Sequence, residues 1–420
     1  IYTLSLHDAL PISTSLEIMG RFDRFFDDRD VSKIAATRKD EAHPIVGLPP
    51  GRWLCEGVYL VECFYPMGAL HGVKPLVRPE DMVVMKHFGD GEPVVFLDLE
   101  TTGLAGGTGT YAFLCGIGMT DGERFKVTQI FLEGPAKEGQ WLDAIGDLIP
   151  AGACLVTYNG RRFDIPLLRT RHILARTSPG WDGLPHIDLL YHARKLYRGC
   201  LDSCSLGSME KHILGVVRSR TDIPGYLIPS IYVQYLRTRD AECLDGVFYH
   251  NGMDILSLVA LYNHVASVLE GNSTDGGELA RAGDMWYSLG HTERARALWA
   301  SSSREPSSKV VAHVRIAFCA KKEKDFKTAR DEFSLALKTM KEMEGRDIHG
   351  ERFDVVLILE ELAKIEEHRL HMFEEALEHT REALSWLGRN RYLLGGSFVR
   401  MNCEKRLRSE ERRVGKECRS

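Results

Sequence analysis

Two acidic residues in an apolar stretch are the first candidates for chemistry in this 420-residue sequence. Asp98 and Glu100 stand two positions apart in the run FLDLETTG. Side chains two positions apart on a β-strand point to the same face, so the two carboxylates are predicted to project together. Because like charges repel and are costly to bury, the pair favours a cation bound between them. The alternative is a strand that ends in a solvated acidic turn at Gly103.

A third acidic residue, Asp164, follows the buried stretch CLVT at the start of a predicted helix. Its ordinary structural role would be to cap that helix. The residues just before it favour a functional role, because two arginines there suit the geometry of a phosphate group. The candidates for contact with a substrate are Asn159, Arg161, Arg162 and Phe163.

A fourth acidic residue, Asp254, stands four positions after His250 in the run HNGMD. Residues four apart on a helix lie on one face, so the two side chains can reach a common site. The alternative is an ordinary pair on the surface of a helix. Oxygen ligands without cysteine favour hard divalent cations such as Mg²⁺ or Mn²⁺.

Alternating strands and helices over residues 91–270 are predicted to position these side chains. Strands that first meander and then alternate with helices indicate an α/β fold with a mixed sheet. Residues 14–90 are predicted to form an N-terminal segment with short strands, one of them within Trp53–Phe64, and we assign this segment no chemistry. The predicted strands are Val94–Asp98, Tyr111–Met119, Phe125–Leu132 and Cys154–Thr157, and the predicted helices cover Lys137–Ile149, begin at Asp164 and Asp188, and run over Leu244–Leu269.

The order of these motifs resembles that of the DEDD exonucleases of the ribonuclease H-like superfamily. A closer resemblance is to the YprB-like family of predicted bacterial exonucleases, through FLDLETTGL, TYNGRRFD, DLL, DIPG and HNGMDILSL. The resemblance covers about residues 50–265 closely and the rest of the chain loosely. It implies a ribonuclease H-like mixed sheet flanked by helices, followed by tetratricopeptide repeats.

The resemblance also implies a two-metal-ion nuclease, a 3′–5′ exonuclease that hydrolyses phosphodiester bonds of single-stranded DNA or RNA. Two ions, Mg²⁺ or Mn²⁺, would stabilise the scissile phosphate and activate water. The implied metal ligands are Asp98, Glu100, Asp164 and Asp254, and the implied catalytic set adds His250. Thr101 joins Asn159, Arg161, Arg162 and Phe163 as implied substrate-binding residues.

The general base is the point at which this sequence departs from the DEDD pattern. The two main branches place it as H-x-x-x-x-D or as Y-x-x-x-D. Here His250 has the spacing of the tyrosine branch, and Tyr249 has the spacing of the histidine branch. We favour His250, because it aligns with Asp254 and because imidazole suits proton abstraction near neutral pH.

A helical repeat is predicted over residues 275–400. Ala295 and Trp299 recur 34 residues later as Ala329 and Phe333, and Ala376 and Ala383 extend the pattern. A period of 34 residues is that of the tetratricopeptide repeat, in which a small residue lets a neighbouring helix pack closely. The alternative is a helical bundle of another kind. The repeats predict a surface for a protein partner rather than a catalyst.

Both ends of the chain are predicted to be artefacts. One DNA string that encodes Arg408–Cys418 also encodes Thr3–Ile12 on its reverse complement, in another frame. A sequencing adapter translated at both ends of an assembled fragment explains that relation. Residues 1–13 and 408–420 are therefore not expected to belong to the fold.

The composition is that of a globular protein with a net charge of −5. Mild acidity argues against a protein that coats nucleic acid through a basic face, and not against a metal-dependent nuclease. The scattered cysteines form no zinc set and are typical of a cytoplasmic protein, and the sequence contains no apolar run of membrane-spanning length. Two rival functions stay open: an inactive ribonuclease H-like scaffold that acts through its helical repeats, and a structure-specific endonuclease that uses the same site.

Overall fold

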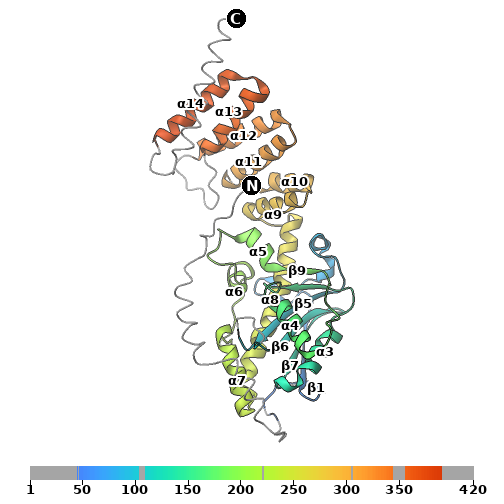
Figure 1. Ribbon diagram of the computed structural model, residues 1–420. Coiled ribbons are helices and arrows are strands. Elements are labelled where there is room, and N and C mark those ends of the chain that lie inside the picture. The colour runs from blue at the N-terminus through green and yellow to red at the C-terminus, as the bar shows by residue number, and fades with distance from the viewer. Residues whose placement is uncertain are drawn as a thin grey trace, which may run out of the picture. The chain divides into compact units, whose positions relative to one another are not determined.

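The computed structural model describes residues 45, 47–103, 109–219, 222–303, 306–343 and 355–389. Figure 1 shows them as ribbons. The described residues fall into two compact units. Those up to Ala193 and those of Ser203–Ala266 form the first, and those of Arg194–Asp202 and from Ser267 onward form the second. Both of the predicted adapter segments, residues 1–13 and 408–420, lie outside the described residues.

A seven-stranded mixed sheet forms the centre of the first unit, in the order β1-β2-β7-β6-β5-β8-β9. Strand β5 pairs antiparallel with β6 on one side and parallel with β8 on the other. The predicted α/β fold with a mixed sheet is thus confirmed. The strands are β1 (Arg52–Cys55), β2 (Val58–Pro66), β5 (Val94–Thr101), β6 (Ala112–Asp121), β7 (Arg124–Leu132), β8 (Cys154–Thr157) and β9 (His186–Asp188).

Helices pack on this sheet (Figure 1), and its apolar side chains are buried. Phe113 of β6 stacks on Tyr232 of α7 with ring centroids 3.9 Å apart, and Trp141 of α3 is fully buried and donates to the carbonyl of Ile130, 2.9 Å away. These contacts fix α3 and α7 against the sheet. The helices are α3 (Glu138–Leu148), α4 (Asp164–Ala175), α5 (Leu189–Tyr197), α6 (Leu206–Met209), α7 (Ile228–Thr238) and α8 (Asp245–Glu270), with shorter turns η3 (Pro135–Lys137), η4 (Glu210–Leu214), η5 (Gly225–Leu227) and η6 (Glu242–Leu244).

Helix α8 is long and apolar because it is a core helix. Among the described residues, the stretch Glu242–Glu270 is apolar enough to cross a membrane by length and composition, and 72% of its most apolar window is buried inside the protein. Tyr262 of α8 packs edge-on against Phe96 of β5, with ring centroids 5.6 Å apart. The apolar surface of α8 therefore packs against the sheet.

Most predicted elements agree with the structure, and two differ in an informative way. The strand that begins at Val94 continues to Thr101, so Glu100 lies within β5 and not in a turn after it. Asp188 does not begin a helix as predicted; it is the last residue of β9, and α5 begins at Leu189. A strand of three residues is too short to show the alternation by which strands are recognised in a sequence.

The described part of the N-terminal segment belongs to the first unit. Strand β2 pairs with β7 along its whole length, from Val58 opposite Leu132 to Pro66 opposite Arg124. The strand predicted within Trp53–Phe64 is confirmed, as the hairpin β1–β2. Further along the chain lie the hairpin β3 (Leu70–His71) and β4 (Lys74–Pro75) and the short turns η1 (Pro79–Asp81) and η2 (Val83–His87).

The second unit is helical in its described part. Helices α10 and α12 begin 34 residues apart, and Ala295, Trp299, Ala329 and Phe333 are all buried, as the predicted pattern requires. A Cβ on Gly283 would lie 2.4 Å from the indole nitrogen of Trp299, so α9 and α10 approach closely there. The tetratricopeptide assignment stays a prediction. The helices are α9 (Gly276–Ser288), α10 (Thr292–Ser302), α11 (Pro306–Lys322), α12 (Phe326–Glu342), α13 (Val355–Ile365), η7 (Glu366–Leu370) and α14 (Phe373–Arg389).

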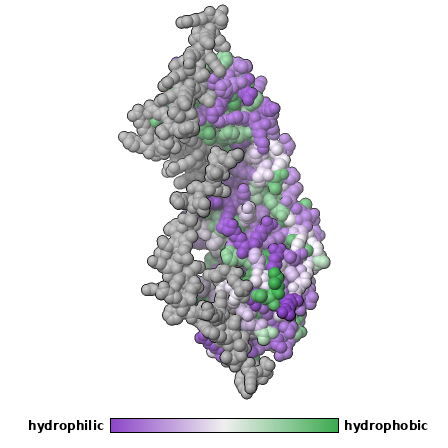
Figure 2. Space-filling model, in the orientation of Figure 1, coloured by the Kyte–Doolittle hydropathy of each residue, from purple (hydrophilic) through white to green (hydrophobic). Residues whose placement is uncertain are grey.

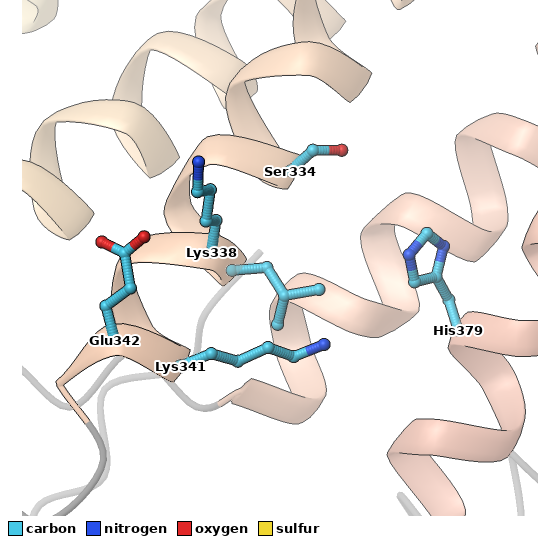
Figure 3. A pocket seen from close by; sticks show the side chains of 6 residues that line it. Ser334, Lys338, Lys341, Glu342 and His379 are labelled. Carbon is cyan, nitrogen blue, oxygen red and sulfur yellow. The ribbon is translucent and has the colours of Figure 1, made fainter.

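A shallow pocket of about 480 Å³ lies between α12 and α14 of the second unit. Figure 3 shows Lys338 and Lys341 of α12 on one side and His379 of α14 on the other. Lys341 is already paired with Glu382 at 2.7 Å, and the Nδ1 atom of His379 with Glu366 at 2.7 Å. Figure 2 shows a largely hydrophilic visible face with hydrophobic residues in small groups.

Candidate active site

Strand β5 brings two carboxylates to the centre of the sheet. Asp98 lies opposite Gly116 of the neighbouring strand β6, and Glu100 lies opposite Leu114. The side chain of Glu100 is buried, and its Oε1 atom has no hydrogen-bond partner among the described residues. A buried carboxylate oxygen without a partner is costly. This oxygen therefore has the environment of a ligand atom rather than that of a structural side chain.

Gly116 of β6 leaves room for Asn251 of α8, which is the hydrogen-bond partner of Asp98. A Cβ on Gly116 would lie 2.4 Å from the Oδ1 atom of Asn251, so only glycine lets α8 approach β6 at this point. The amide nitrogen of Asn251 then donates to Oδ2 of Asp98 at 2.9 Å. Gln129 of β7 donates to Oδ1 of Asn251 at 3.1 Å and fixes its orientation. Asn251 therefore positions the Asp98 carboxylate.

Asp164 is the first residue of α4, directly after an unusual loop. Asn159 in that loop has a φ of 64°, in the left-handed region that Asn tolerates better than most residues. The Asp188 carboxylate accepts hydrogen bonds from the backbone nitrogens of Asn159 at 2.7 Å and Arg161 at 3.2 Å. Asp188 thus holds the loop that delivers Asp164 to the site.

Helix α8 contributes Asp254 and His250, which lie on one face as their spacing predicts. The Nε2 atom of His250 is 3.7 Å from Oδ2 of Asp254. On the other side of the ring, Nδ1 lies 2.9 Å from Oδ1 of Asp222. The remaining Asp254 oxygen, Oδ1, pairs with the guanidinium of Arg218. The described residues around Asp254 therefore include one histidine and one arginine.

The four carboxylates form one electrostatic cluster, because the charge of Asp254 raises the pKa of each of the other three. Burial raises the pKa of both Asp98 and Glu100 well above the ordinary values, and the neighbouring carboxylates, Asp254 foremost, raise it further. Burial, opposed by a backbone hydrogen bond and aided by other aspartates, raises the pKa of Asp164 to about 7. Burial also raises the pKa of Asp254, against the opposing effect of Arg218 and then His250.

These four side chains fit a hard divalent cation by the chemistry of their donors. Crowded, buried carboxylates with raised pKa values repel one another, and a multivalent cation relieves that repulsion. The unpartnered Oε1 atom of Glu100 adds an available ligand. In the part of the chain that the structure describes, no three His, Cys, Asp or Glu side chains already stand close enough to enclose an ion. Metal binding to this cluster would therefore draw its side chains together.

The predicted substrate-binding residues lie at the edges of the site. Thr101 ends β5 and donates to the carbonyl of Gly103 at 2.9 Å. The guanidinium of Arg161 donates to the carbonyl of His186, so it is held by the protein. Arg162 and Phe163 are exposed just before α4, Phe163 with half of its surface accessible. Asn159 contributes its backbone geometry to the loop.

Several polar residues of the site had no predicted role. Arg218 and Glu210 stand in a segment without periodic pattern, so nothing in the sequence indicates that they reach α8. Asp222 and Asn251 fall within the motifs DIPG and HNGMD, which the resemblance had marked without giving these residues a function. Their positions inside those motifs were the one available signal.

Comparison with known proteins agrees with the fold. Residues 95–266 match the RNase_H superfamily, a range that contains all four carboxylates. With the mixed sheet, this match shows that the first unit is a ribonuclease H-like domain. The chain is also similar to "Uncharacterized protein YprB" of Bacillus subtilis (strain 168), with 31% identity over 363 residues that cover 81% of this chain and 83% of that protein. The chain therefore belongs to the YprB family.

The raised pKa of Asp164 predicts how stability changes with pH in the metal-free protein. The folded state keeps a proton on Asp164 up to a pH of about 7, whereas an unfolded aspartate loses it near its ordinary pKa of 3.8. The stabilisation is thus complete at low pH and is lost as the pH rises through 7. We expect the urea midpoint of the wild type to fall relative to that of Asp164→Asn between pH 4.5 and 7.5. A difference between the two proteins that is constant with pH would contradict the prediction.

Proposed function

We propose that this chain is a divalent-metal-dependent nuclease, and more narrowly a 3′–5′ exonuclease that acts on single-stranded DNA or RNA. The observation that carries the proposal is the clustering of four carboxylates from three separate elements, β5, α4 and α8, within a ribonuclease H-like domain. A structural role would not require four mutually repelling acids in one place, because such a cluster costs stability.

Each carboxylate has a proposed place in metal binding. Asp98, Glu100, Asp164 and Asp254 would hold the two ions between them through their carboxylate oxygens. Bound Mg²⁺ or Mn²⁺ supplies charge stabilisation of the phosphate and lowers the pKa of attacking water. Asn251 keeps the Asp98 carboxylate in place during this process through its 2.9 Å hydrogen bond.

His250 is the proposed general base, and this role requires the tautomer with the proton on Nδ1. The Asp222 carboxylate lies 2.9 Å from Nδ1 and favours that tautomer because it can only accept, whereas the Arg218 guanidinium, 3.1 Å from the same nitrogen, can only donate and opposes it. The Nε2 lone pair is then free on the side of Asp254 and able to accept a proton from water. Tyr249 is occupied elsewhere, because its hydroxyl accepts from the backbone nitrogen of Ser219 at 3.0 Å.

Two substitutions test this assignment. His250→Ala is expected to lower kcat by roughly 10²–10⁴-fold with a small change in KM, because loss of a general base affects the chemical step. Tyr249→Phe is expected to lower kcat far less. The measurement is steady-state hydrolysis of a labelled oligonucleotide, which gives kcat and KM separately for each variant. A larger defect in Tyr249→Phe would assign the base to Tyr249 instead.

The experiment that tests the function as a whole is a degradation assay with the purified full chain. Single-stranded DNA and RNA labelled at either end are incubated with Mn²⁺, with Mg²⁺ or with a chelator. Shortening from the 3′ end that requires a metal supports the proposal. Cleavage of a circular substrate indicates the endonuclease alternative. No degradation of any substrate, with or without a metal ion, indicates the scaffold alternative. The helices of the second unit are proposed to bind a protein partner in the cytoplasm in either case.

A further inference from the structure

Arg218 is a cation placed inside the carboxylate cluster. Its Nε and Nη2 atoms donate to the two oxygens of Glu210 at 2.8 and 2.6 Å, which is a bidentate pair. The same Nη2 atom pairs with Asp254. The Nη1 atom lies 3.4 Å from Asp222 and 3.1 Å from Nδ1 of His250. Arg218 therefore contacts a proposed metal ligand, the proposed base and the residue that orients that base.

Glu210, the ion-pair partner of Arg218, is itself fixed by further hydrogen bonds. The hydroxyl of Ser257 on α8 donates to Glu210 at 2.5 Å, and His71 of β3 lies 2.8 Å from that hydroxyl. The segment that leads to Arg218 is fixed as well, since the backbone nitrogen of Val73 donates to the Leu214 carbonyl at 2.8 Å. The N-terminal hairpin β3–β4 thus supports the arginine, although the sequence assigned this hairpin no chemistry.

The contact between Arg218 and Asp254 cannot persist unchanged when a divalent cation binds. Asp254 offers two oxygens, and Arg218 takes Oδ1. A metal ion at Asp254 would repel the guanidinium and compete with it for the carboxylate. Glu210 retains Arg218 through two bonds, so displacement from Asp254 leaves the guanidinium in the site with donors free. A planar guanidinium with free donors matches a phosphate group.

We propose that Arg218 is the counter-ion of the metal-free site, and that it exchanges Asp254 for a phosphate of the nucleic acid when a divalent cation binds. The inference rests on the proposed nuclease function. Arg218 pairs with Asp254 while the metal is absent, which lowers the repulsion within the cluster. In the metal-loaded protein it binds the phosphate directly, held by Glu210 on its other side.

Two variants of the full chain separate this exchange from a purely structural role. Glu210→Gln with Arg218→Met removes the buried pair as a unit, so neither charge is left without its partner. Loss of the competing cation should tighten Mn²⁺ binding roughly tenfold by calorimetry, which corresponds to about 1.4 kcal/mol. Thymidine 5′-monophosphate should bind the Mn²⁺-loaded variant about tenfold more weakly, for loss of a charged hydrogen bond. Arg218→Lys keeps the charge, so Mn²⁺ affinity should stay near that of the wild type while the nucleotide still binds more weakly.

The matched control is Arg169→Met with Asp182→Asn, an exposed pair of the same unit. It should change neither affinity. Mn²⁺ binding that is unchanged or weaker in the Glu210/Arg218 variant would overturn the exchange, as would unchanged nucleotide binding. Either of these results overturns the inference about Arg218 alone if the wild type still binds Mn²⁺ and Asp98→Asn abolishes that binding. If neither the wild type nor the Glu210/Arg218 variant binds Mn²⁺, and the wild type degrades no substrate, the proposed nuclease function fails as well.

Discussion

Asp98→Asn is expected to lower the rate of metal-dependent hydrolysis by at least about a thousandfold, which is roughly 4 kcal/mol of transition-state stabilisation. Asparagine keeps the shape of the side chain and its contact with Asn251, and removes a charge that is proposed to help hold the ions. The fold should be retained. Because the Asp98 carboxylate is buried among other acids that raise its pKa, the metal-free variant should be at least as stable as the wild type.

The measurements are single-turnover hydrolysis and the melting temperature with and without Mn²⁺. Mn²⁺ should raise the melting temperature of the wild type, because a ligand at a hundred times its Kd adds about 2.7 kcal/mol of stability. It should leave that of Asp98→Asn unchanged. Asp121→Asn serves as a control, since this aspartate is exposed at the end of β6. Hydrolysis at the wild-type rate by Asp98→Asn would show that the carboxylate cluster is not the catalytic site.

Arg171→Met is expected to have the largest effect on stability. Arg171 of α4 donates to both oxygens of Glu138 at 2.5 and 2.6 Å, and both side chains are almost wholly buried. The guanidinium also lies 3.9 Å from the ring centre of Tyr111. Removing it leaves a buried carboxylate without its partner, which typically costs about 3–5 kcal/mol. For a domain of this size that lowers the melting temperature by roughly 10 °C.

A double replacement shows whether the cost arises from the unpaired charge. Glu138→Leu with Arg171→Met replaces the buried pair by apolar side chains and should recover most of the lost stability. Arg169→Met, which breaks an exposed pair with Asp182, should cost less than about 1 kcal/mol. The free energy of unfolding from urea titrations measures all three. Equal losses in Arg171→Met and Arg169→Met would refute the prediction.

The elements of the fold could be predicted where their apolar residues recur with the period of a strand or a helix. The strand that holds Asp98 and the long helix with His250 and Asp254 follow from apolar patterns that span several residues. Strand β9 and the hairpin β3–β4 are too short to show such a pattern. Strand β9 forms by pairing with β8, and β3 and β4 pair with each other in a separate two-stranded sheet. The sequence therefore shows the elements that bear the acids and misses those that support them.

The candidate site shows the same division. Its four acids were singled out by residue type and position, and the resemblance to the DEDD exonucleases, rather than their spacing, grouped them into one predicted site. Arg218 and Glu210 could not have been predicted, because their part in the site depends on a contact across 36 and 47 residues of sequence to α8. Local patterns carry no information about such contacts. The outcome for Arg161 is similar, since its engagement with the His186 carbonyl depends on how β9 lies beside β8.

The glycines of β6 bear on how this domain tolerates mutation. Cβ atoms on Gly116 and Gly118 would lie 2.4 Å from Asn251 and 2.5 Å from Ile255, so any side chain there pushes α8 away from the sheet. That helix carries Asp254 and the amide that holds Asp98. A substitution at either glycine would thus reach the carboxylates by displacing a whole helix, without touching a reactive group. We therefore expect random mutagenesis to find Gly116 and Gly118 among the positions that tolerate the fewest substitutions, although neither has a side chain that could take part in the chemistry.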